Sequence, residues 1–216
     1  MSSICTLCNS RDVNIFHSLT NKFGKKDFLL CGNCDLIFVP PEFHPAPDIE
    51  KKRYDLHEND QGDMGYKKHL QDFEEIVSPY IDRSIKGLDF GCGPYPLLAD
   101  IFREKGYTVD IYDPFFFNDP GILNNKFDFI TCTETIEHFR DPNKEFHMLN
   151  SLLISGGILC IMTGIVENRD DFPDWHYIQD ITHLAFYSKQ TLGWIAENFD
   201  WNILYSENDV IVFEKN

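Results

Sequence analysis

Basic residues are scarce in this chain of 216 residues. Lysine and arginine together number 19 against 35 aspartate and glutamate residues, so the formal net charge is −16. Nucleic-acid binding rests largely on lysine and arginine side chains that neutralise phosphates. The charge therefore argues against DNA or RNA as a partner or substrate.

Long hydrophobic runs are also absent. The longest, such as residues 157–162, are far shorter than the roughly 20 apolar residues that span a bilayer. The first residues show no basic flank followed by an apolar stretch, so they do not resemble a secretory signal. Because 43% of the residues are hydrophobic, the chain can build one main core and a small appendage. We expect a cytoplasmic protein with no membrane contact.

The seven cysteines are an odd number, which does not suit a disulfide framework. Four of them form two C-x-x-C pairs, "CTLC" and "CGNC", at Cys5, Cys8, Cys31 and Cys34. This spacing is typical of four thiolates around one tetrahedral zinc ion, and Gly32 suits the tight turn of the second pair. We expect a zinc ribbon over residues 1–40, with two short strands and a closed, structural metal site. The alternative is four unligated thiols in a reducing cytosol.

A proline-rich stretch at residues 40–47 predicts a stiff, extended connector and a domain boundary. Residues 66–80 carry apolar side chains at a helical period, which predicts an amphipathic helix laid on the main domain. Residues 41–82 are therefore interpreted as a linker and helices that cover a site. The polar loop before the helix is a candidate lid with four side chains to contact substrate: Tyr54, His57, Asn59 and Tyr66. The alternative is a solvated connection.

The stretch "GLDFGCGPYPLLADIF" at residues 87–102 reads as a strand, a glycine turn and a helix. Asp113 ends the next predicted strand twenty residues after Gly93, the separation at which a carboxylate meets a ribose diol. A dinucleotide-binding turn needs a third glycine where this chain has Pro96, so an NAD-dependent oxidoreductase is disfavoured. Asp89 before the turn suits an ammonium group and would repel phosphate.

Four motifs together resemble a class I S-adenosylmethionine-dependent methyltransferase: "LDFGCG" at residues 88–93, "VDIYDP" at 109–114, "FDFITCTETIEHFRDP" at 127–142 and "LLISGGILCIM" at 152–162. They cover most of residues 85–163. The resemblance implies a Rossmann-like methyltransferase domain over residues 83–216 that binds S-adenosylmethionine. It implies these cofactor-binding residues: Asp89, Phe90, Gly91, Cys92, Gly93, Asp113, Pro114, Phe115, Cys132, Thr133 and Glu134. The ribbon ahead of such a domain is similar to one in nucleotide-sugar C-methyltransferases, which are longer.

The segment between Asp113 and the third of these motifs is short. Its thirteen residues, 114–126, are too few for the usual helix and strand, so we expect the third strand of the fold to be lost. The α/β sheet should then have the order 2-1-4-5-7-6, with strand 7 antiparallel in a final hairpin over residues 200–216. Phe115, Phe116 and Phe117 either form an aromatic wall for the adenine or pack in the core.

Residues 163–188 predict a long loop at the carboxyl end of a strand, where ligands bind in open α/β sheets. His183 is the first candidate for a general base and His176 the second, because imidazole titrates near neutral pH. Tyr177 and Asp180 are candidate orienting partners, and Trp175 is a candidate substrate or lid residue together with Tyr54, His57 and Tyr66. The alternative for each histidine is a hydrogen bond that fixes the loop, the role we expect for His138.

The sequence thus predicts an S-adenosylmethionine-dependent methyltransferase that acts on a small-molecule acceptor. Methyl transfer from a sulfonium is an in-line displacement, so the main task of the site is to align the acceptor, and a base is needed only if the acceptor loses a proton. The alternative is a noncatalytic methyltransferase-like binding protein that contacts a partner through its zinc ribbon. The acceptor, the methylated atom and the oligomeric state stay open.

Overall fold

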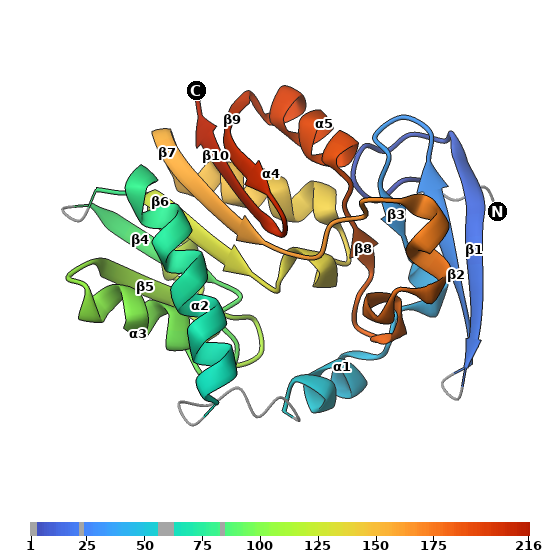
Figure 1. Ribbon diagram of the computed structural model, residues 1–216, viewed down its shortest axis with the longest axis horizontal. Helices are drawn as coiled ribbons and strands as arrows, with labels where there is room; N and C mark the ends of the chain where they lie inside the picture. The colour runs from blue at the N-terminus through green and yellow to red at the C-terminus, as the bar shows by residue number, and fades with distance from the viewer. Residues whose placement is uncertain (1–3, 22–23, 56–62, 83–84) are drawn as a thin grey trace.

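The computed structural model describes residues 4–21, 24–55, 63–82 and 85–216. Two β-sheets lie side by side, a large one on the left of Figure 1 and a smaller one on the right that contains the N-terminal hairpin. The predicted His57 and Asn59 fall outside the described residues. Among the helices that the structure describes, none has the length and apolar character to cross a membrane.

The larger sheet has six strands: β4 (Lys86–Phe90), β5 (Thr108–Tyr112), β6 (Phe127–Thr133), β7 (Leu153–Met162), β9 (Trp201–Glu207) and β10 (Val210–Lys215). Their spatial order is β5-β4-β6-β7-β10-β9. The first four are parallel, and β10 is antiparallel to both of its neighbours. In the numbering of the predicted fold, β4 is strand 1, β5 strand 2, β6 strand 4, β7 strand 5, β9 strand 6 and β10 strand 7, and strand 3 is missing. The spatial order then reads 2-1-4-5-7-6.

The segment between β5 and β6 is described throughout and contributes no strand to the sheet. It holds one turn of 3-10 helix, η3 (Ile122–Asn124), and an isolated bridge between Asp113 and Phe117. β5 therefore forms the edge of the sheet, and the Asp113 turn stays at this edge.

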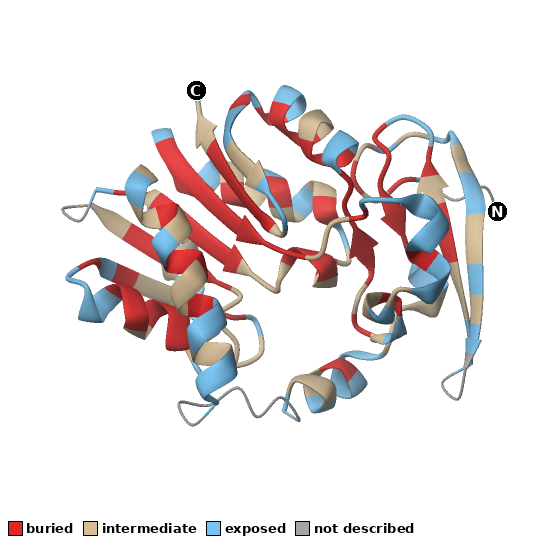
Figure 2. Ribbon diagram, in the orientation of Figure 1, coloured by how far each residue is buried: buried red, intermediate tan, exposed pale blue. Residues whose placement is uncertain are grey.

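Helices cover both faces of this sheet. α2 (Met64–Val77) and α3 (Leu97–Glu104) lie on one face, and α4 (Pro142–Leu152) and α5 (Lys189–Phe199) on the other (Figure 1). Along β7, Cys160 and Met162 pack with the first pair of helices while Leu159 and Ile161 pack with the second. This alternation follows from the period of two in a strand and explains why the central strands are buried along most of their length (Figure 2).

The smaller sheet joins distant parts of the sequence. Its order is β1 (Val13–Asn21), β2 (Gly24–Cys31), β3 (Ile37–Phe38) and β8 (Ala185–Phe186). β8 comes from the segment that was expected to be a long loop, and that segment also forms two 3-10 helices, η5 (Arg169–Asp174) and η6 (His176–Gln179). The expectation of an irregular loop was therefore wrong in these places, because pairing with β3 orders the segment.

The connector between the sheets is more helical than expected. Residues 40–47 are not extended throughout, because η1 (Pro41–Phe43) is a 3-10 turn and α1 (Pro47–Tyr54) begins at the last proline. Proline is favourable at a helix start, where its missing N–H costs no hydrogen bond. Tyr54 thus ends a helix instead of lying in a loop. Further short 3-10 turns are η2 (Ser78–Tyr80) and η4 (Ile136–His138).

Candidate functional site

A cavity of about 820 Å³ opens at the carboxyl ends of β4, β5 and β6. α1, α2 and the segment before β8 contribute its other walls. The structure brings these predicted residues together in its lining: Tyr54, Tyr66, Asp89, Phe90, Gly91, Cys92, Gly93, Asp113, Pro114, Phe115, Thr133, Glu134 and His183. Parallel strands end at the same edge of a sheet, so motifs far apart in sequence meet here.

The turn after β4 uses its two glycines in different ways. Both have positive φ, 79° at Gly91 and 65° at Gly93, a region that residues with a Cβ rarely adopt. A Cβ on Gly91 would lie 2.3 Å from the Thr135 side chain, whereas a Cβ on Gly93 would meet no protein atom within 4 Å. Gly91 therefore permits close packing within the protein, and Gly93 leaves open space at the cavity wall.

Asp113 links this turn to the end of β5. Its carboxylate accepts hydrogen bonds from the backbone N–H of Gly93 at 3.1 Å, Phe115 at 2.8 Å and Phe116 at 3.1 Å. The side chain is 7% exposed and lines the cavity. Three fixed donors hold the carboxylate in place. Oδ1 accepts two of these hydrogen bonds and Oδ2 accepts one, so Oδ2 keeps capacity for another.

Asp89 lies deeper, at the floor of the cavity. It is 2% exposed and accepts a hydrogen bond of 3.0 Å from the Thr131 hydroxyl. Burial raises the pKa of Asp89 to about 7. A cationic partner would favour the ionised form of this carboxyl group and would lower its pKa.

Two histidines, His138 and His183, line the cavity. His183 Nδ1 donates to the Tyr177 carbonyl oxygen at 2.8 Å, and His138 Nδ1 donates to the Thr182 carbonyl oxygen at 2.9 Å. Because a carbonyl only accepts, both Nδ1 atoms carry the proton and both Nε2 atoms have a lone pair in the neutral rings. Burial and the neighbouring His138 lower the pKa of His183 to about 4. His138 thus fixes the loop as predicted and also lines the cavity, which was not predicted.

Glu137 is a fully buried carboxylate behind these histidines. It accepts hydrogen bonds from the Tyr177 hydroxyl at 2.6 Å and the Thr163 hydroxyl at 2.9 Å. Burial and the charge of Glu137 raise the pKa of Glu134, which lines the cavity, to about 8. Sequence reasoning did not identify Glu137 as a site residue, although its place inside the motif at residues 127–142, shortly after β6, was a usable signal.

Five predicted site residues do not line the cavity. Cys132 is fully buried below it, and His176 is exposed on η6. Tyr177 and Trp175 stack on one another with ring centroids 4.7 Å apart, against the smaller sheet. Asp180 forms a salt bridge of 2.8 Å with Arg53 of α1. These positions follow from the tight packing of residues 163–188, which turns several polar side chains toward structural partners.

The lining also contains residues that the sequence analysis did not identify. Arg140 donates to the Glu50 carboxylate and to the Pro45 carbonyl oxygen, so it ties the end of β6 to α1. The Tyr54 hydroxyl donates to Glu50 at 3.0 Å.

Phe116 lines the cavity beside Phe115, whereas Phe117 does not.

The sequence matches a family model described as a methyltransferase domain over residues 64–206. This chain belongs to the methyltransferase domain family. The match includes the turn that carries Asp89, Gly91 and Gly93. It also includes the strands of the larger sheet up to residue 206 of β9, and it ends before β10. No curated protein matches the chain in sequence.

Solved structures share the fold of this methyltransferase domain at low sequence identity. One is 1,6-didemethyltoxoflavin-N1-methyltransferase from Burkholderia thailandensis with bound 1,6-didemethyltoxoflavin and S-adenosylhomocysteine; its TM-score is 0.56 at 13% identity, covering 86% of this chain and 97% of that chain. Another is a SAM-dependent methyltransferase from Archaeoglobus fulgidus, with a TM-score of 0.53 at 18% identity, covering 65% of this chain and 73% of that chain. At these identities the likeness shows a common fold.

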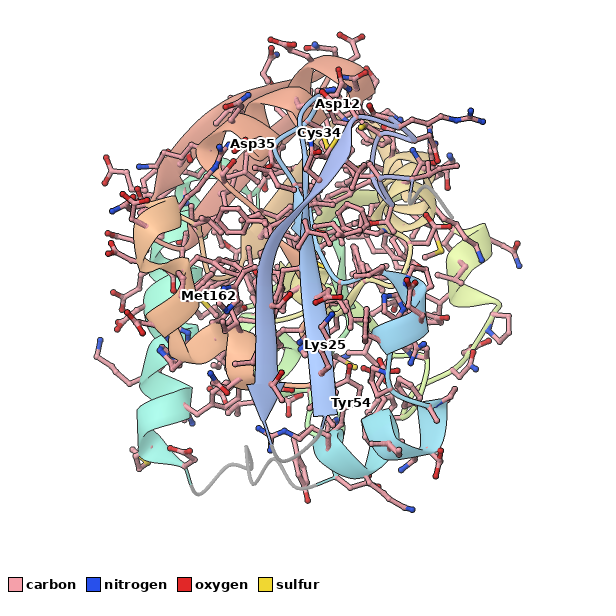
Figure 3. All side chains as sticks on the ribbon, turned by 90° about the vertical axis from the view of Figure 1, so that its right-hand side faces the viewer. Asp12, Lys25, Cys34, Asp35, Tyr54 and Met162 are labelled. Atoms are coloured by element: carbon pink, nitrogen blue, oxygen red, sulfur yellow. The ribbon has the colours of Figure 1, made fainter. Side chains whose placement is uncertain are left out.

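Four cysteine sulfurs gather at one end of the smaller sheet, beside the methyltransferase domain. Atoms from Cys5, Cys8, Cys31 and Cys34 lie within 4.8 Å of one another, with Sγ–Sγ distances of 3.5 Å for Cys5–Cys34 and 3.4 Å for Cys8–Cys31. Figure 3 shows Cys34 at this end of the β1–β2 hairpin and Tyr54 toward the opposite end. The residues directly after the two C-x-x-C pairs, Asn9 and Asp35, have a left-handed backbone conformation, and Gly32 does not. Gly32 is needed instead because a Cβ there would lie 2.2 Å from the Asp12 carboxylate.

Lys26 connects this sheet to the acceptor side of the methyltransferase domain. Its Nζ donates to the carbonyl oxygens of Asp180 and His183, both at 2.9 Å, and burial lowers the pKa of Lys26 to about 8. The hairpin therefore holds the backbone on which the cavity-lining His183 is mounted.

Proposed function

We propose that this chain is an S-adenosylmethionine-dependent methyltransferase that acts on a small-molecule acceptor. One observation carries the proposal: the Asp89–Gly93 turn, Asp113 and His183 face a single cavity in a chain of the methyltransferase domain family. The shared fold of solved methyltransferases supports it.

The residues around the turn fit this cofactor. Asp89 would pair with the ammonium group of the methionine part, which offsets the cost of burying its carboxylate. The open space at Gly93 lets a ligand approach the backbone closely, and Oδ2 of Asp113 has acceptor capacity for a ribose hydroxyl. Phe115 and Phe116 offer aromatic surface to the adenine. When bound, S-adenosylmethionine supplies an electrophilic methyl group on its sulfonium sulfur.

The acceptor would occupy the part of the cavity bordered by His183, His138 and Tyr54. His183 would help to orient the nucleophilic group of the acceptor. Alignment of two bound reactants supplies most of the acceleration in a displacement of this kind. His176 and Trp175 have no part in this proposal, because they lie outside the cavity lining.

A small molecule is the acceptor class that the cavity fits best. The cavity volume of about 820 Å³ lies within the usual range for small-molecule sites. The net charge of −16 disfavours polyanions such as nucleic acid.

We further propose that the four cysteines hold a structural zinc ion and that the chain is cytoplasmic, where thiols stay reduced. Zinc–sulfur bonds of about 2.3 Å in a tetrahedron place sulfurs about 3.8 Å apart. The Sγ–Sγ distances of 3.4 and 3.5 Å are close to this value. Because four thiolates close the site, the zinc would stabilise the fold and take no part in catalysis.

Thermal unfolding with S-adenosylhomocysteine tests the cofactor proposal. A ligand at about 100 times its Kd adds roughly 2.7 kcal/mol of stability, which should raise the midpoint by roughly 5 to 11 °C in a chain of this size. NAD at the same concentration should give no shift. Asp113→Asn should lose most of the shift, because an amide replaces one acceptor oxygen with a donor.

The matched control is Asp110→Asn on β5, the strand that Asp113 follows. Asp110 pairs with Lys86 and does not line the cavity, so this variant should keep the full shift. If wild type shows no shift with S-adenosylhomocysteine, the cofactor proposal is wrong, and the noncatalytic binding protein becomes the better hypothesis.

A further inference from the structure

Glu137, His138 and His183 form a second group of metal-ligating side chains, separate from the cysteines. One ligand atom from each residue lies within 4.8 Å of the other two. Glu137 and His138 lie on η4, directly after β6, and His183 comes from the segment that leads into β8. Two elements that are distant in sequence thus aim a carboxylate and two imidazoles at one point.

Each of these side chains has the supporting hydrogen bonds that metal ligands need. Ligating histidines donate their other ring N–H to a carbonyl or carboxylate, and ligating carboxylates are themselves hydrogen-bonded. His138 and His183 donate through Nδ1 to backbone carbonyls, which leaves Nε2 of both rings for a ligand. The two oxygens of Glu137 are held by the hydroxyls of Tyr177 and Thr163 and keep further lone pairs.

The spacing suits an ion between the groups better than a direct bond. His138 Nε2 lies 4.0 Å from the Glu137 carboxylate, too far for a hydrogen bond. A tetrahedral ion with bonds of about 2.1 Å would hold such atoms about 3.4 Å apart. This pair of side chains would therefore need to close by roughly 0.6 Å, given the separation of 4.0 Å.

We propose that Glu137, His138 and His183 bind a divalent transition-metal ion, zinc or a similar ion, at the acceptor end of the cavity. Two imidazoles and one carboxylate suit zinc and its neighbours, whereas Mg²⁺ and Ca²⁺ prefer oxygen ligands. The protein supplies three ligands, and a fourth position stays open.

The open position gives the proposed ion a role in acceptor recognition, a point that rests on the proposed function. His138 and His183 line the cavity, while Glu137 is fully buried behind them. The protein thus closes one side of the ion, and the other side faces the acceptor region. The class of acceptor that fits carries an oxygen or nitrogen donor at, or next to, the atom that is methylated.

Metal stoichiometry tests this site directly. The full chain, first stripped of metal and then dialysed against zinc with a weak competing chelator, should retain two zinc ions by mass spectrometry of the elements. His183→Ala and His138→Ala should each retain one. His147→Ala, a change of an exposed histidine on α4, should retain two. Far-UV circular dichroism should show that all four proteins are folded.

The outcomes separate this proposal from the cysteine site and from the cofactor. The double variant of His138 and His183 should lose this ion and keep the zinc held by the four cysteines. One zinc in wild type, or two in the double variant of His138 and His183, would overturn the proposal. Zinc is counted without S-adenosylhomocysteine. A negative zinc result therefore does not contradict the cofactor proposal, and a negative thermal-shift result does not contradict the metal site.

Discussion

Two glycines of the cofactor turn differ in what surrounds them. We expect Gly91→Ala to lower stability by about 1 to 3 kcal/mol, because the new methyl group overlaps Thr135 and the positive φ adds strain. Gly93→Ala should cost only about 1 kcal/mol from its positive φ. Its methyl group enters the open space of the cavity wall, so binding of S-adenosylhomocysteine should be lost. Urea unfolding and the thermal shift with this ligand measure the two effects.

Gly106→Ala is the matched control for this pair. Gly106 also has a positive φ and open space around its Cβ, but it follows α3 and does not line the cavity. It should cost about as much stability as Gly93→Ala and keep the full ligand shift. An unchanged ligand shift in Gly93→Ala would mean that the cofactor does not approach this backbone.

Asp89 should make the stability of the ligand-free protein depend on pH. The pKa of Asp89 is about 7 in the folded chain, whereas an unfolded aspartate has a pKa of about 3.9. Between these values the folded state holds a proton that the unfolded state has lost, so this contribution to stability falls as pH rises. The full change is about 4 kcal/mol, at about 1.4 kcal/mol per pKa unit.

Asp89→Asn should remove this dependence. The amide oxygen can still accept from Thr131, so the variant should gain stability relative to wild type as pH rises from 4 to 8. Urea unfolding at several pH values measures the difference, with Asp110→Asn as the comparison on a partly exposed carboxylate. A difference between Asp89→Asn and wild type that is constant across this range would contradict the assignment.

At the scale of elements, the short strand β3 joins the cysteine site to the acceptor side. Ile37 and Phe38 pair with Phe186 and Ala185 of β8, and the Val39 N–H donates to the Leu184 carbonyl oxygen at 2.8 Å. β8 is too short to persist alone, since a strand needs partners to satisfy its backbone groups. Loss of order in the cysteine site should therefore spread to His183.

Cys34→Ser should lower the thermal midpoint by more than about 10 °C. Structural zinc contributes on the order of 10 kcal/mol to such sites, and each kcal/mol corresponds to about 2 to 4 °C in a chain of this length. Limited proteolysis should then cut within residues 163–188. After chelation, added zinc should restore the thermal midpoint of wild type but not that of Cys34→Ser. Equal midpoints for wild type and variant would show that the four cysteines hold no structural metal.

At the scale of the whole molecule, one apolar core crosses the boundary between the two sheets. Leu7, Leu36 and Phe38 of the N-terminal part belong to the same buried cluster as Phe146 of α4 and Tyr187 after β8. The Tyr187 hydroxyl also donates to the Ile136 carbonyl oxygen at 2.9 Å. The predicted division into residues 1–40, 41–82 and 83–216 stays a prediction about sequence organisation, and this shared core argues against independent folding of the first part.

We expect the zinc-loaded chain to unfold in one cooperative transition. Calorimetry should give equal calorimetric and van't Hoff enthalpies, with a value of about 150 kcal/mol near 60 °C for the whole chain. A separate early transition that disappears on removal of residues 1–40 would show that the ribbon folds by itself.

Some features could be predicted because they depend on neighbours in the sequence. The amphipathic period of α2, the N-cap Ser188 of α5 and the spacing from Gly93 to Asp113 are local patterns, and the structure contains each of them. The thirteen residues after Asp113 limited what that segment can form, since chain length alone excludes a crossover helix and strand. The family match is in keeping with the cofactor-turn motifs.

The acceptor side could not be predicted in the same way. His176 and His183 lie in one polar segment and looked alike as candidate bases, yet one is exposed and the other lines the cavity. Pairing of β8 with β3 and the contacts of Lys26 decide which way each residue of this segment points, and both partners lie some 150 residues away. Sequence patterns determined the elements and the cofactor turn because these follow from local spacing. Only the tertiary structure placed Glu137, His138 and His183 together, because long-range packing brings residues from two separate segments to one end of the cavity.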